Sequence, residues 1–306
     1  MRVISLLPSA TEIVAALGGM EHLVGVTHAC DHPPLVDSRV RVTRTAIDDT
    51  AAPGAVDAQV REIAESGRPL YALYEDRIRA LQPDLILTQA LCEVCAVMES
   101  DVREVAARLS PVPRVITLAA TSFDGVLDDI SVVGEALGLA DEAAEFVSGA
   151  RARLRTVHET LTTAKAHRPR VAVIEWGDPL YAAGHWVPEM VRRAGGVDVL
   201  AQPGEHSVVV TLEAVRAADP DVILIAPCGY DLARSVAEGE RLLARPEWAW
   251  ARDRRAYALD ANAFASRPGP RLVDGVEVMA RLFHPTLFTP VEPAFARSLT
   301  PPAHSA

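Results

Sequence analysis

The sequence predicts an α/β protein with two lobes joined by a long helical stretch. Apolar residues recur at steps of three or four from Phe123 to Leu137 and again from Ala143 to Leu161, which is the period of an amphipathic helix. Short apolar strands alternate with helices on both sides of this stretch, and each side begins with an Arg-Val pair, at Arg2 and Arg170. A single large sheet with one crossover helix is the alternative that this pattern leaves open.

The expected division is therefore an N-terminal lobe over residues 1–121, a linking helix over 122–167, and a C-terminal lobe over 168–285. Ser122 is a candidate N-cap for the linking helix, and Asp141 and Glu142 favour a second helix start after the break at Gly138. Beyond Pro285 the prolines and the loss of apolar periodicity predict a tail, residues 286–306, without a fixed fold.

In the first lobe the pattern predicts a strand over 2–7, then a helix with Ser9 and Glu12 as a capping box, ended by Gly18 and Gly19. A strand over 23–27 leads into the loop 28–34, and residues 43–54 read as irregular. The remaining expected elements are helices over 56–66 and 74–81, a strand over 83–88, a helix reaching Leu109, and a strand over 115–118.

The second lobe repeats this alternation of elements. Strands are expected over 171–175, 222–226 and 257–259, and helices over 188–194, 212–217 and 272–283, with Thr211 as the N-cap of the middle helix. Each strand leads into a loop, and these loops cover 176–186, 227–231 and 260–271. Loops that follow parallel strands line the crevice where α/β proteins bind ligands.

Composition and charge exclude several classes of function. The chain has 306 residues, 49% of them hydrophobic, which is enough for two cores, and its net charge of -11 disfavours binding to nucleic acid. The longest apolar runs are too short to span a bilayer. No signal peptide is seen in the sequence as given, so we expect a cytoplasmic location, or an extracytoplasmic one if an upstream leader is missing.

Aromatic, imidazole and guanidinium groups gather in the expected exit loops. Flat aromatic faces suit a large planar macrocycle, a neutral imidazole suits a metal such as cobalt, and arginine suits amides or phosphate. Each group also has a structural alternative. An aromatic ring can cover the core of its own lobe, a histidine can be a hydrogen-bonded surface residue, and the arginines can pair with Asp260 or Asp274. The candidate ligand-binding residues are Trp176, Tyr181, His185, Trp186, Tyr230, Arg267, Arg271 and His28.

The cysteines form a separate local signal. Cys30, Cys92, Cys95 and Cys228 each follow an expected strand, so all four are expected to lie in loops at the same edge of their sheets and are the candidate metal ligands. Cys92 and Cys95 form a C-x-x-C pair at an expected helix N-terminus, where thiol pKa values fall, which suits a metal ion or a redox pair. Thiolate contact with a bound cobalt and simple packing are the alternatives.

Four segments resemble the cobalamin-binding branch of the ABC-transporter substrate-binding proteins, with the similarity extending over about residues 1–285. They are residues 2–12 (RVISLLPSATE), 25–34 (GVTHACDHPP), 81–86 (LQPDLI) and 266–271 (SRPGPR). The resemblance implies two Rossmann-like lobes on one rigid backbone helix, the class III periplasmic-binding-protein fold. It also implies non-catalytic binding of a corrinoid or metal chelate between the lobes, and one acidic residue per lobe that docks on a membrane permease. Asp76, or Glu75 beside it, and Glu213 resemble those acidic positions.

The sequence departs from the exported members of that family. It carries an insertion over residues 45–73 and the C-x-x-C pair, features that make it most similar to a leaderless subgroup. Three functions compete: binding of cobalamin or a related corrinoid, binding of another chelate such as a ferric siderophore or haem, and a metal or redox role for Cys92 and Cys95. No nucleophile and base pair, phosphate loop or paired carboxylates indicate an enzyme.

Overall fold

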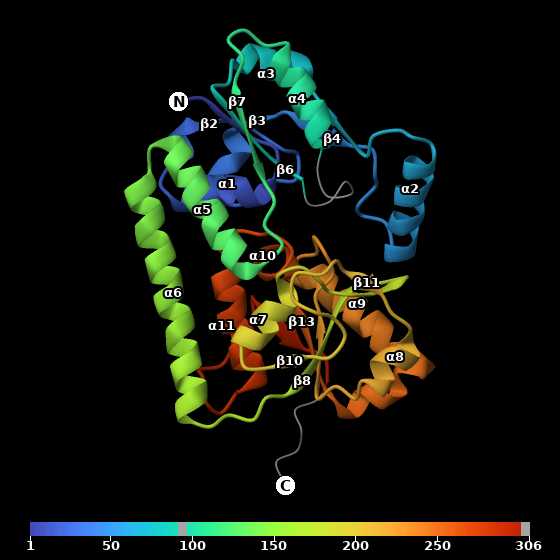
Figure 1. Cartoon of the computed structure of the whole chain (residues 1–306). Coiled ribbons are helices and arrows are strands. Elements are labelled where there is room, and N and C mark those ends of the chain that lie inside the picture. Colours follow the sequence, from blue (N-terminus) through green and yellow to red (C-terminus); the bar gives the residue numbers. More distant parts are fainter. Residues whose placement is uncertain (91–96, 301–306) are drawn as a thin grey trace. The chain divides into compact units, whose positions relative to one another are not determined.

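The computed structural model describes residues 1–90 and 97–300, and the chain divides into two compact units (Figure 1). Unit 1 comprises Met1–Ala120 and Asp124–Ser148, and unit 2 comprises Thr121–Phe123 and the residues from Gly149 onward. Strands 3–5 and 170–177 belong to different sheets. The single-sheet alternative is therefore wrong, and the two-lobed α/β class is confirmed.

The sheet of unit 1 is parallel throughout, in the order β3-β2-β1-β6-β7. Its strands are β1 (Val3–Ser5), β2 (Leu23–Val26), β3 (Val40–Arg41), β6 (Leu85–Gln89) and β7 (Arg114–Leu118). The chain moves from β1 towards β3 and then returns to β6 on the other side of β1. This reversal makes the carboxyl ends of β1 and β6 the switch point of the sheet, where α/β proteins bind ligands.

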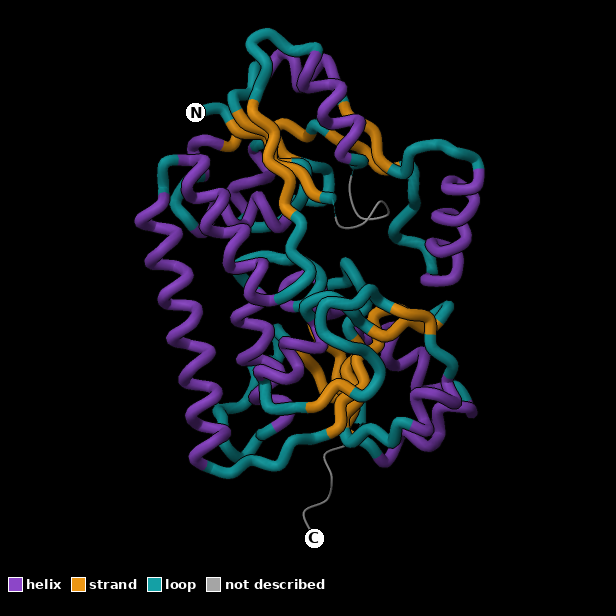
Figure 2. Tube along the Cα trace, viewed as in Figure 1, coloured by secondary structure: helices purple, strands orange, loops and turns teal. Residues whose placement is uncertain are grey.

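Helices cover the sheet of unit 1, as the purple and orange tubes of Figure 2 show. They are α1 (Pro8–Ala16), α3 (Glu75–Leu81) and α4 (Glu99–Ala107), with the 3-10 turns η1 (Met20–His22) and η2 (Pro34–Ser38). Ile4 and Ile86 of the sheet pack with Ile78 of α3 and Val102 of α4. The expected capping box is wrong, because Pro8 starts α1 one residue before Ser9 and Leu7 is the N-cap.

The insertion over residues 45–73 is ordered. Antiparallel strands β4 (Thr43–Thr45) and β5 (Tyr71–Leu73) flank α2 (Pro53–Glu65), so the stretch expected to be irregular begins with a strand. Tyr71 and Leu73 pack against the core of unit 1. The insertion is therefore anchored at its base by a short β-ladder.

The sheet of unit 2 follows the order β11-β9-β8-β12-β13-β14, with β10 also paired to β8. Strands β10, β8, β12 and β13 are parallel, whereas β9, β11 and β14 are joined by antiparallel pairing. The bounds are β8 (Arg170–Gly177), β9 (Leu180–Ala182), β10 (Val197–Asp198), β11 (Val208–Val209), β12 (Val222–Ile225), β13 (Arg255–Leu259) and β14 (Ala296–Ser298).

Two groups of helices cover the two faces of this sheet. Val215 of α8 and Leu242 of α9 pack with Ile174 and Ile223 and with Trp248 of η3. On the other face, a Cβ at Gly196 would lie within 3.1 Å of Val171, Val191 and Phe283, which places α7 and α11 there. The elements are α7 (Val187–Arg193), α8 (Leu212–Ala217), α9 (Leu232–Ala244), η3 (Pro246–Asp253), α10 (Ala261–Phe264) and α11 (Leu272–Phe283).

The linking stretch consists of two helices, α5 (Phe123–Leu137) and α6 (Ala140–Thr163). Gly138, with φ of 73°, ends α5 in the left-handed conformation that glycine adopts without a steric penalty. The boundary between the two units falls within α6, at Gly149. Over the described residues, no helix is both long and apolar enough to cross a membrane.

The expectation of a structureless tail differs from the structure. Residues 296–298 form β14, which pairs antiparallel with β13 and places Ala296 opposite Leu259. Ala296 is buried, and Leu299 packs against the core of unit 2. The segment has no periodic pattern because its order comes from an edge position on the sheet, which local sequence does not encode.

Candidate ligand-binding site

The switch point of the unit 2 sheet carries an aromatic pair. β8 and β12 are neighbours, and the chain leaves them towards opposite edges of the sheet. Trp176 lies near the carboxyl end of β8 and Tyr230 in the loop after β12. Their rings meet edge to face, with centroids 5.5 Å apart and planes at 66°, and the Trp176 indole donates to the Asp178 carbonyl at 3.1 Å. Two of the residues expected from sequence are thus brought together.

The segment expected to be one long loop, residues 176–186, is mainly a β-hairpin. β8 extends to Gly177, and a turn at residues 178–179 returns the chain as β9, with Tyr181 opposite Trp176. Trp186 lies just beyond this hairpin, is 8% exposed, and donates from Nε1 to the Ala265 carbonyl at 2.7 Å. The Trp186 ring therefore fastens α7 to the loop after α10, and its contact with a ligand stays a prediction.

His185 forms a pair with His206, a residue that the sequence did not single out. Nε2 of His185 lies 3.2 Å from Nδ1 of His206, with the ring planes at 89°. Burial, and secondly the His206 charge, lower the pKa of His185. His185 is held in the left-handed region, with φ of 54°, while its backbone N–H donates to the Glu205 carbonyl at 2.6 Å. A neutral imidazole is the form that binds a metal.

Glu175 is a second residue that sequence reasoning missed. It lies in β8, where its carboxylate accepts a hydrogen bond from the Ser207 hydroxyl, and that hydroxyl accepts from the Gly184 N–H at 3.1 Å. Burial raises the pKa of Glu175, against the effect of these hydrogen bonds. The available signal was a carboxylate at the end of the otherwise apolar run 171–175. Its partner Ser207 is distant in sequence.

Two cations border the aromatic pair and were also missed. The Arg234 guanidinium lies 3.8 Å from the centroid of the Tyr230 ring. Arg241 donates from Nε to the buried carboxylate of Glu238 at 2.7 Å. Both cations come from α9, which begins at Asp231, directly after the loop that holds Tyr230. This edge of unit 2 therefore combines an aromatic pair with a cation, and the Tyr230 ring between them is 6% exposed.

The two predicted arginines lie around the start of α11. Arg267 is buried at 9% exposure, and Arg271 is the N-cap residue of α11 and partly buried. Among their suggested partners, Asp274 forms an ion pair with Arg153 at 2.5 Å, and Asp260 caps α10 by accepting from the Ala263 N–H at 2.9 Å. Ligand contact by either arginine stays a prediction.

In unit 1, His28 follows β2, as expected. Its Nδ1 lies 2.7 Å from the Thr43 hydroxyl, and its ring stacks on Tyr71 at 5.6 Å. Burial is the main cause that lowers the pKa of His28, so the neutral ring is favoured. Of its two tautomers, only the one with the proton on Nδ1 leaves the Nε2 lone pair available to a metal.

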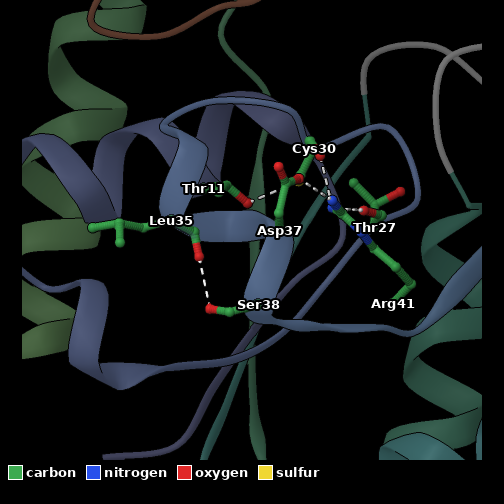
Figure 3. A network of polar contacts seen from close by, with 7 residues as sticks. All are labelled: Thr11, Thr27, Cys30, Leu35, Asp37, Ser38 and Arg41. Carbon is green, nitrogen blue, oxygen red and sulfur yellow. Dashed lines mark hydrogen bonds and ion pairs between the residues drawn. The ribbon is translucent and has the colours of Figure 1, made fainter.

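The loop after β2 is held by a polar network (Figure 3). Arg41 donates to the carbonyls of Thr27 and Cys30 at 3.1 and 2.7 Å, and it pairs with Asp37 at 3.1 Å. Cys30 is 2% exposed, and its sulfur lies 3.1 Å from the Thr11 hydroxyl. Cys30 therefore occupies a packing position, which was one of the roles that the sequence left open.

Of the other three cysteines, the structure describes one. Cys228 is exposed in the loop after β12. Cys92 and Cys95 lie outside the described residues, so their metal or redox role stays a prediction. Over residues 1–90 and 97–300, no group of three or more histidine, cysteine, aspartate or glutamate side chains is arranged to hold a metal ion.

The two acidic positions expected to dock on a permease lie in first helical turns. The Asp76 side chain is 98% exposed and pairs with Arg79 at 3.0 Å, while Glu75 pairs with Arg108 at 2.9 Å. Glu213 is exposed in the first turn of α8, which Thr211 caps by accepting from the Ala214 N–H. Carboxylates near helix N-termini are favoured in any case, so docking stays a prediction.

Two α/β units with separate sheets, and an aromatic pair at the switch point of one of them, are typical of the two-lobed binding proteins. The chain belongs to the periplasmic binding protein family, whose sequence model matches residues 3–263. It is accordingly a binding protein and not an enzyme.

Known proteins with similar sequences or folds agree with this class. The cobalamin-binding protein of Halobacterium salinarum is 26% identical over 291 residues, covering 93% of this chain and 70% of that one. An ABC-transporter substrate-binding lipoprotein of Bacillus subtilis is 25% identical, covering 94% and 81%. In fold, the crystal structure of a periplasmic haem-binding protein of Pseudomonas aeruginosa has a TM-score of 0.72 at 24% identity, with 97% of each chain covered.

Proposed function

We propose that the protein binds cobalamin or a related corrinoid at the carboxyl-edge loops of its sheets. The observation that carries this proposal is the Trp176 and Tyr230 pair at the switch point of unit 2. His185, whose pKa is lowered by burial, follows the neighbouring strand β9. A corrinoid has a broad, partly apolar macrocycle and a metal with axial positions. Aromatic rings suit the macrocycle, and an imidazole suits the metal.

The residues present fit such a ligand in kind. Nε2 of His185 is already within 3.2 Å of another polar atom, Nδ1 of His206, so one of the two nitrogens holds the shared proton and the other accepts it. A ligand metal would take the place of that proton. In unit 1, His28 offers a second neutral imidazole, positioned by Thr43. The relative named for cobalamin supports the corrinoid over other chelates.

The alternative is a different metal chelate, such as haem or a ferric siderophore. It is supported by the fold shared with a haem-binding protein, although a fold alone hosts many ligands. Both readings use the same aromatic and imidazole groups. They differ in the ligand that is retained, which absorbance measures directly.

The test is retention of the ligand after gel filtration. The purified protein is incubated with hydroxocobalamin or, in parallel, with haemin, and its absorbance spectrum is recorded after the free ligand is removed. We expect retention of cobalamin near one equivalent and little haemin. Retention of haemin alone would replace the proposal by its alternative, and retention of neither would overturn both.

A matched pair of variants locates the site. Trp176→Ala combined with Tyr230→Ala removes two rings, each contributing roughly 0.5 to 1.5 kcal/mol beyond burial, so affinity should fall about tenfold. Trp250→Ala is the control, because this indole lies in η3, before β13, and therefore at the amino edge of the same sheet. Equal affinity in the double variant and its parent would show that the rings are no platform. Trp186→Ala is a poorer test because its indole holds Ala265.

We also propose that the protein delivers its ligand to an ABC permease through Asp76 and Glu213. The support is the exposure of both carboxylates, one in each unit, together with the similarity to a transporter lipoprotein. The compartment remains a prediction as well, for which cell fractionation with an antibody against the chain is the measurement.

A further inference from the structure

A cationic hollow lies on unit 2, away from the residues discussed above. It has a volume of about 660 Å³ and is lined by the C-terminal half of α6, the turn that follows it, and the end of α7. Arg168 precedes β8 and Gly195 precedes β10, two neighbouring parallel strands. The hollow is therefore at the amino edge of the sheet, whereas Trp176 and Tyr230 are at its carboxyl edge.

The charge of this hollow is opposite to that of the protein. Among the described residues, its lining includes six arginine or lysine side chains and no carboxylate, although the whole chain has a net charge of -11. His158 and Thr162 add polar groups. The cations are Arg151, Arg155, Lys165, Arg168, Arg192 and Arg193.

Some of these cations have roles in the fold. Arg192 and Arg193 pair with Glu189 at 3.2 and 2.8 Å, and Arg168 donates to the Gly196 carbonyl at 2.7 Å. Lys165 follows the last turn of α6, where a positive charge complements the helix carbonyls. These contacts give four of the six cations a structural role that needs no ligand.

Arg151 and Arg155 are not explained in this way. They lie about 18 and 12 Å before the end of α6 along its axis, beyond the last turn in which the helix dipole acts. Spaced four residues apart, two like charges destabilise a helix slightly. Arg153, by contrast, pairs with Asp274 and Glu277 on α11. The exposed stripe of Arg151, Arg155 and His158 forms no ion pair within the described parts of the chain, so its charge is open to an anion.

We propose that this hollow binds a small molecule that carries two or more phosphate groups. Guanidinium groups bind phosphate oxygens through two parallel hydrogen bonds, and the volume lies within the range of small-ligand sites. A second hollow of about 330 Å³ shares Lys165 and Ala166 and is lined by His167, Arg255 and His284. Its position extends the cationic surface, so a chain of phosphates fits better than a single one.

The experiment is isothermal titration calorimetry of the full chain with inorganic tripolyphosphate, with sulfate as the comparison anion. We expect saturable binding of tripolyphosphate that weakens steeply with added salt. In the variant that combines Arg151→Gln with Arg155→Gln, the affinity for tripolyphosphate should fall at least tenfold, because two guanidinium groups are lost. The variant should keep its fold because both side chains are exposed. The control is Arg216→Gln combined with Arg252→Gln, an equal change in charge on α8 and η3.

The proposal is overturned by the absence of saturable heat with tripolyphosphate, or by an equal loss in the control variant, which would indicate only an effect of net charge. Sedimentation with phosphatidylglycerol vesicles, without binding of free tripolyphosphate, would also overturn it and would assign the hollow to a lipid surface. Retention of hydroxocobalamin should be the same in the parent and in the Arg151 and Arg155 variant. A failure of corrinoid binding is thereby distinguishable from a failure here.

Discussion

At the scale of single residues, Gly177 shows how closely the end of β8 is packed. A Cβ at this position would overlap the Glu238 carboxylate and would lie 3.0 Å from the Arg241 guanidinium. Glu238 is 4% exposed and is neutralised by Arg241. The absence of a side chain at residue 177 therefore makes room for the buried Glu238 carboxylate and its partly exposed partner Arg241, in the residue next to Trp176.

We expect Gly177→Ala to lower the free energy of unfolding by about 1 to 3 kcal/mol, because the added methyl displaces the buried Glu238 carboxylate from its pair with Arg241. The matched control is Gly149→Ala, in the interior of α6, where a Cβ meets nothing within 4 Å and alanine favours the helix by up to about 1 kcal/mol. Urea denaturation of both variants measures the difference. A harmless Gly177→Ala would show that the ion pair moves aside freely.

Asp198 illustrates a buried carboxylate whose charge opposes folding. Oδ1 accepts from the N–H groups of Leu200 and Ala201 at 2.9 and 3.0 Å, whereas Oδ2 has no hydrogen-bond partner within the described parts of the chain. Burial raises the pKa of Asp198 to about 6 from an ordinary value of 3.8. The folded state therefore holds this proton more tightly than the unfolded state.

The stabilisation from that proton is complete below about pH 3.8 and is lost as the pH rises through about 6. Asp198→Asn removes this titration while keeping an oxygen at Oδ1. We expect the melting temperature of the variant, relative to the parent, to rise between pH 4 and pH 7 and then to level off. Calorimetry at four pH values measures this curve, and a pH-independent difference would contradict it.

At the scale of elements, β14 is the clearest departure from the expected pattern. Its pairing with β13 continues into the backbone N–H of Leu299, which donates to the Ala256 carbonyl at 2.8 Å, and the Thr300 hydroxyl accepts from the Ala256 N–H at 3.1 Å. The Leu299 side chain packs over Gly239 of α9, where a Cβ would overlap it. Leu299, directly after the edge strand β14, therefore packs α9 against the sheet.

Leu299→Ala should destabilise the protein by roughly 1 to 2 kcal/mol, the value expected for a partly buried leucine. Leu287→Ala, at a side chain that is 36% exposed, should change stability by less than about 0.5 kcal/mol. Chemical denaturation of the two variants distinguishes an ordered strand from a structureless tail, because equal small effects are the result expected of a tail.

At the scale of the whole molecule, the two units have separate sheets and separate hydrophobic cores. Each places one exposed carboxylate, Asp76 or Glu213, in the first turn of a helix. The Asp76 pair with Arg79 is largely in solvent, where such pairs contribute little to stability. Charge at these positions is therefore free to act in association with a partner.

We expect Asp76→Arg combined with Glu213→Arg to leave retention of hydroxocobalamin unchanged while lowering complex formation with an ABC permease at least tenfold, because like charges oppose docking. The measurement is binding of the loaded protein to its permease in detergent or lipid nanodiscs. Glu142→Arg, at an exposed carboxylate in the first turn of α6, is the control. Undiminished complex formation in the double variant would exclude this docking mode.

The sequence alone was sufficient for elements whose signals are local. The apolar run at residues 222–226 identified β12 because a strand buried on both faces is apolar throughout, and the helical period over residues 272–283 gave the bounds of α11. The position of Tyr230 at a carboxyl edge followed from its place directly after a strand. By contrast, the N-terminus of α1 was ambiguous. Ser9 is a favoured N-cap residue, whereas Pro8 is favoured in the first helical turn, and the sequence does not show which preference prevails.

What the sequence by itself determined, then, is the alternation of elements, the family resemblance and which loops follow strands, since these depend on neighbouring residues. Only the tertiary structure decided which distant side chains meet: His185 with His206, Glu175 with Ser207, and the cations of α6 with those of α7. It also decided the order of residues 296–298 as β14. The physical reason is that these hydrogen bonds, edge pairings and charge clusters join segments that are distant in the sequence. Such contacts leave no signal in the pattern of neighbouring residues.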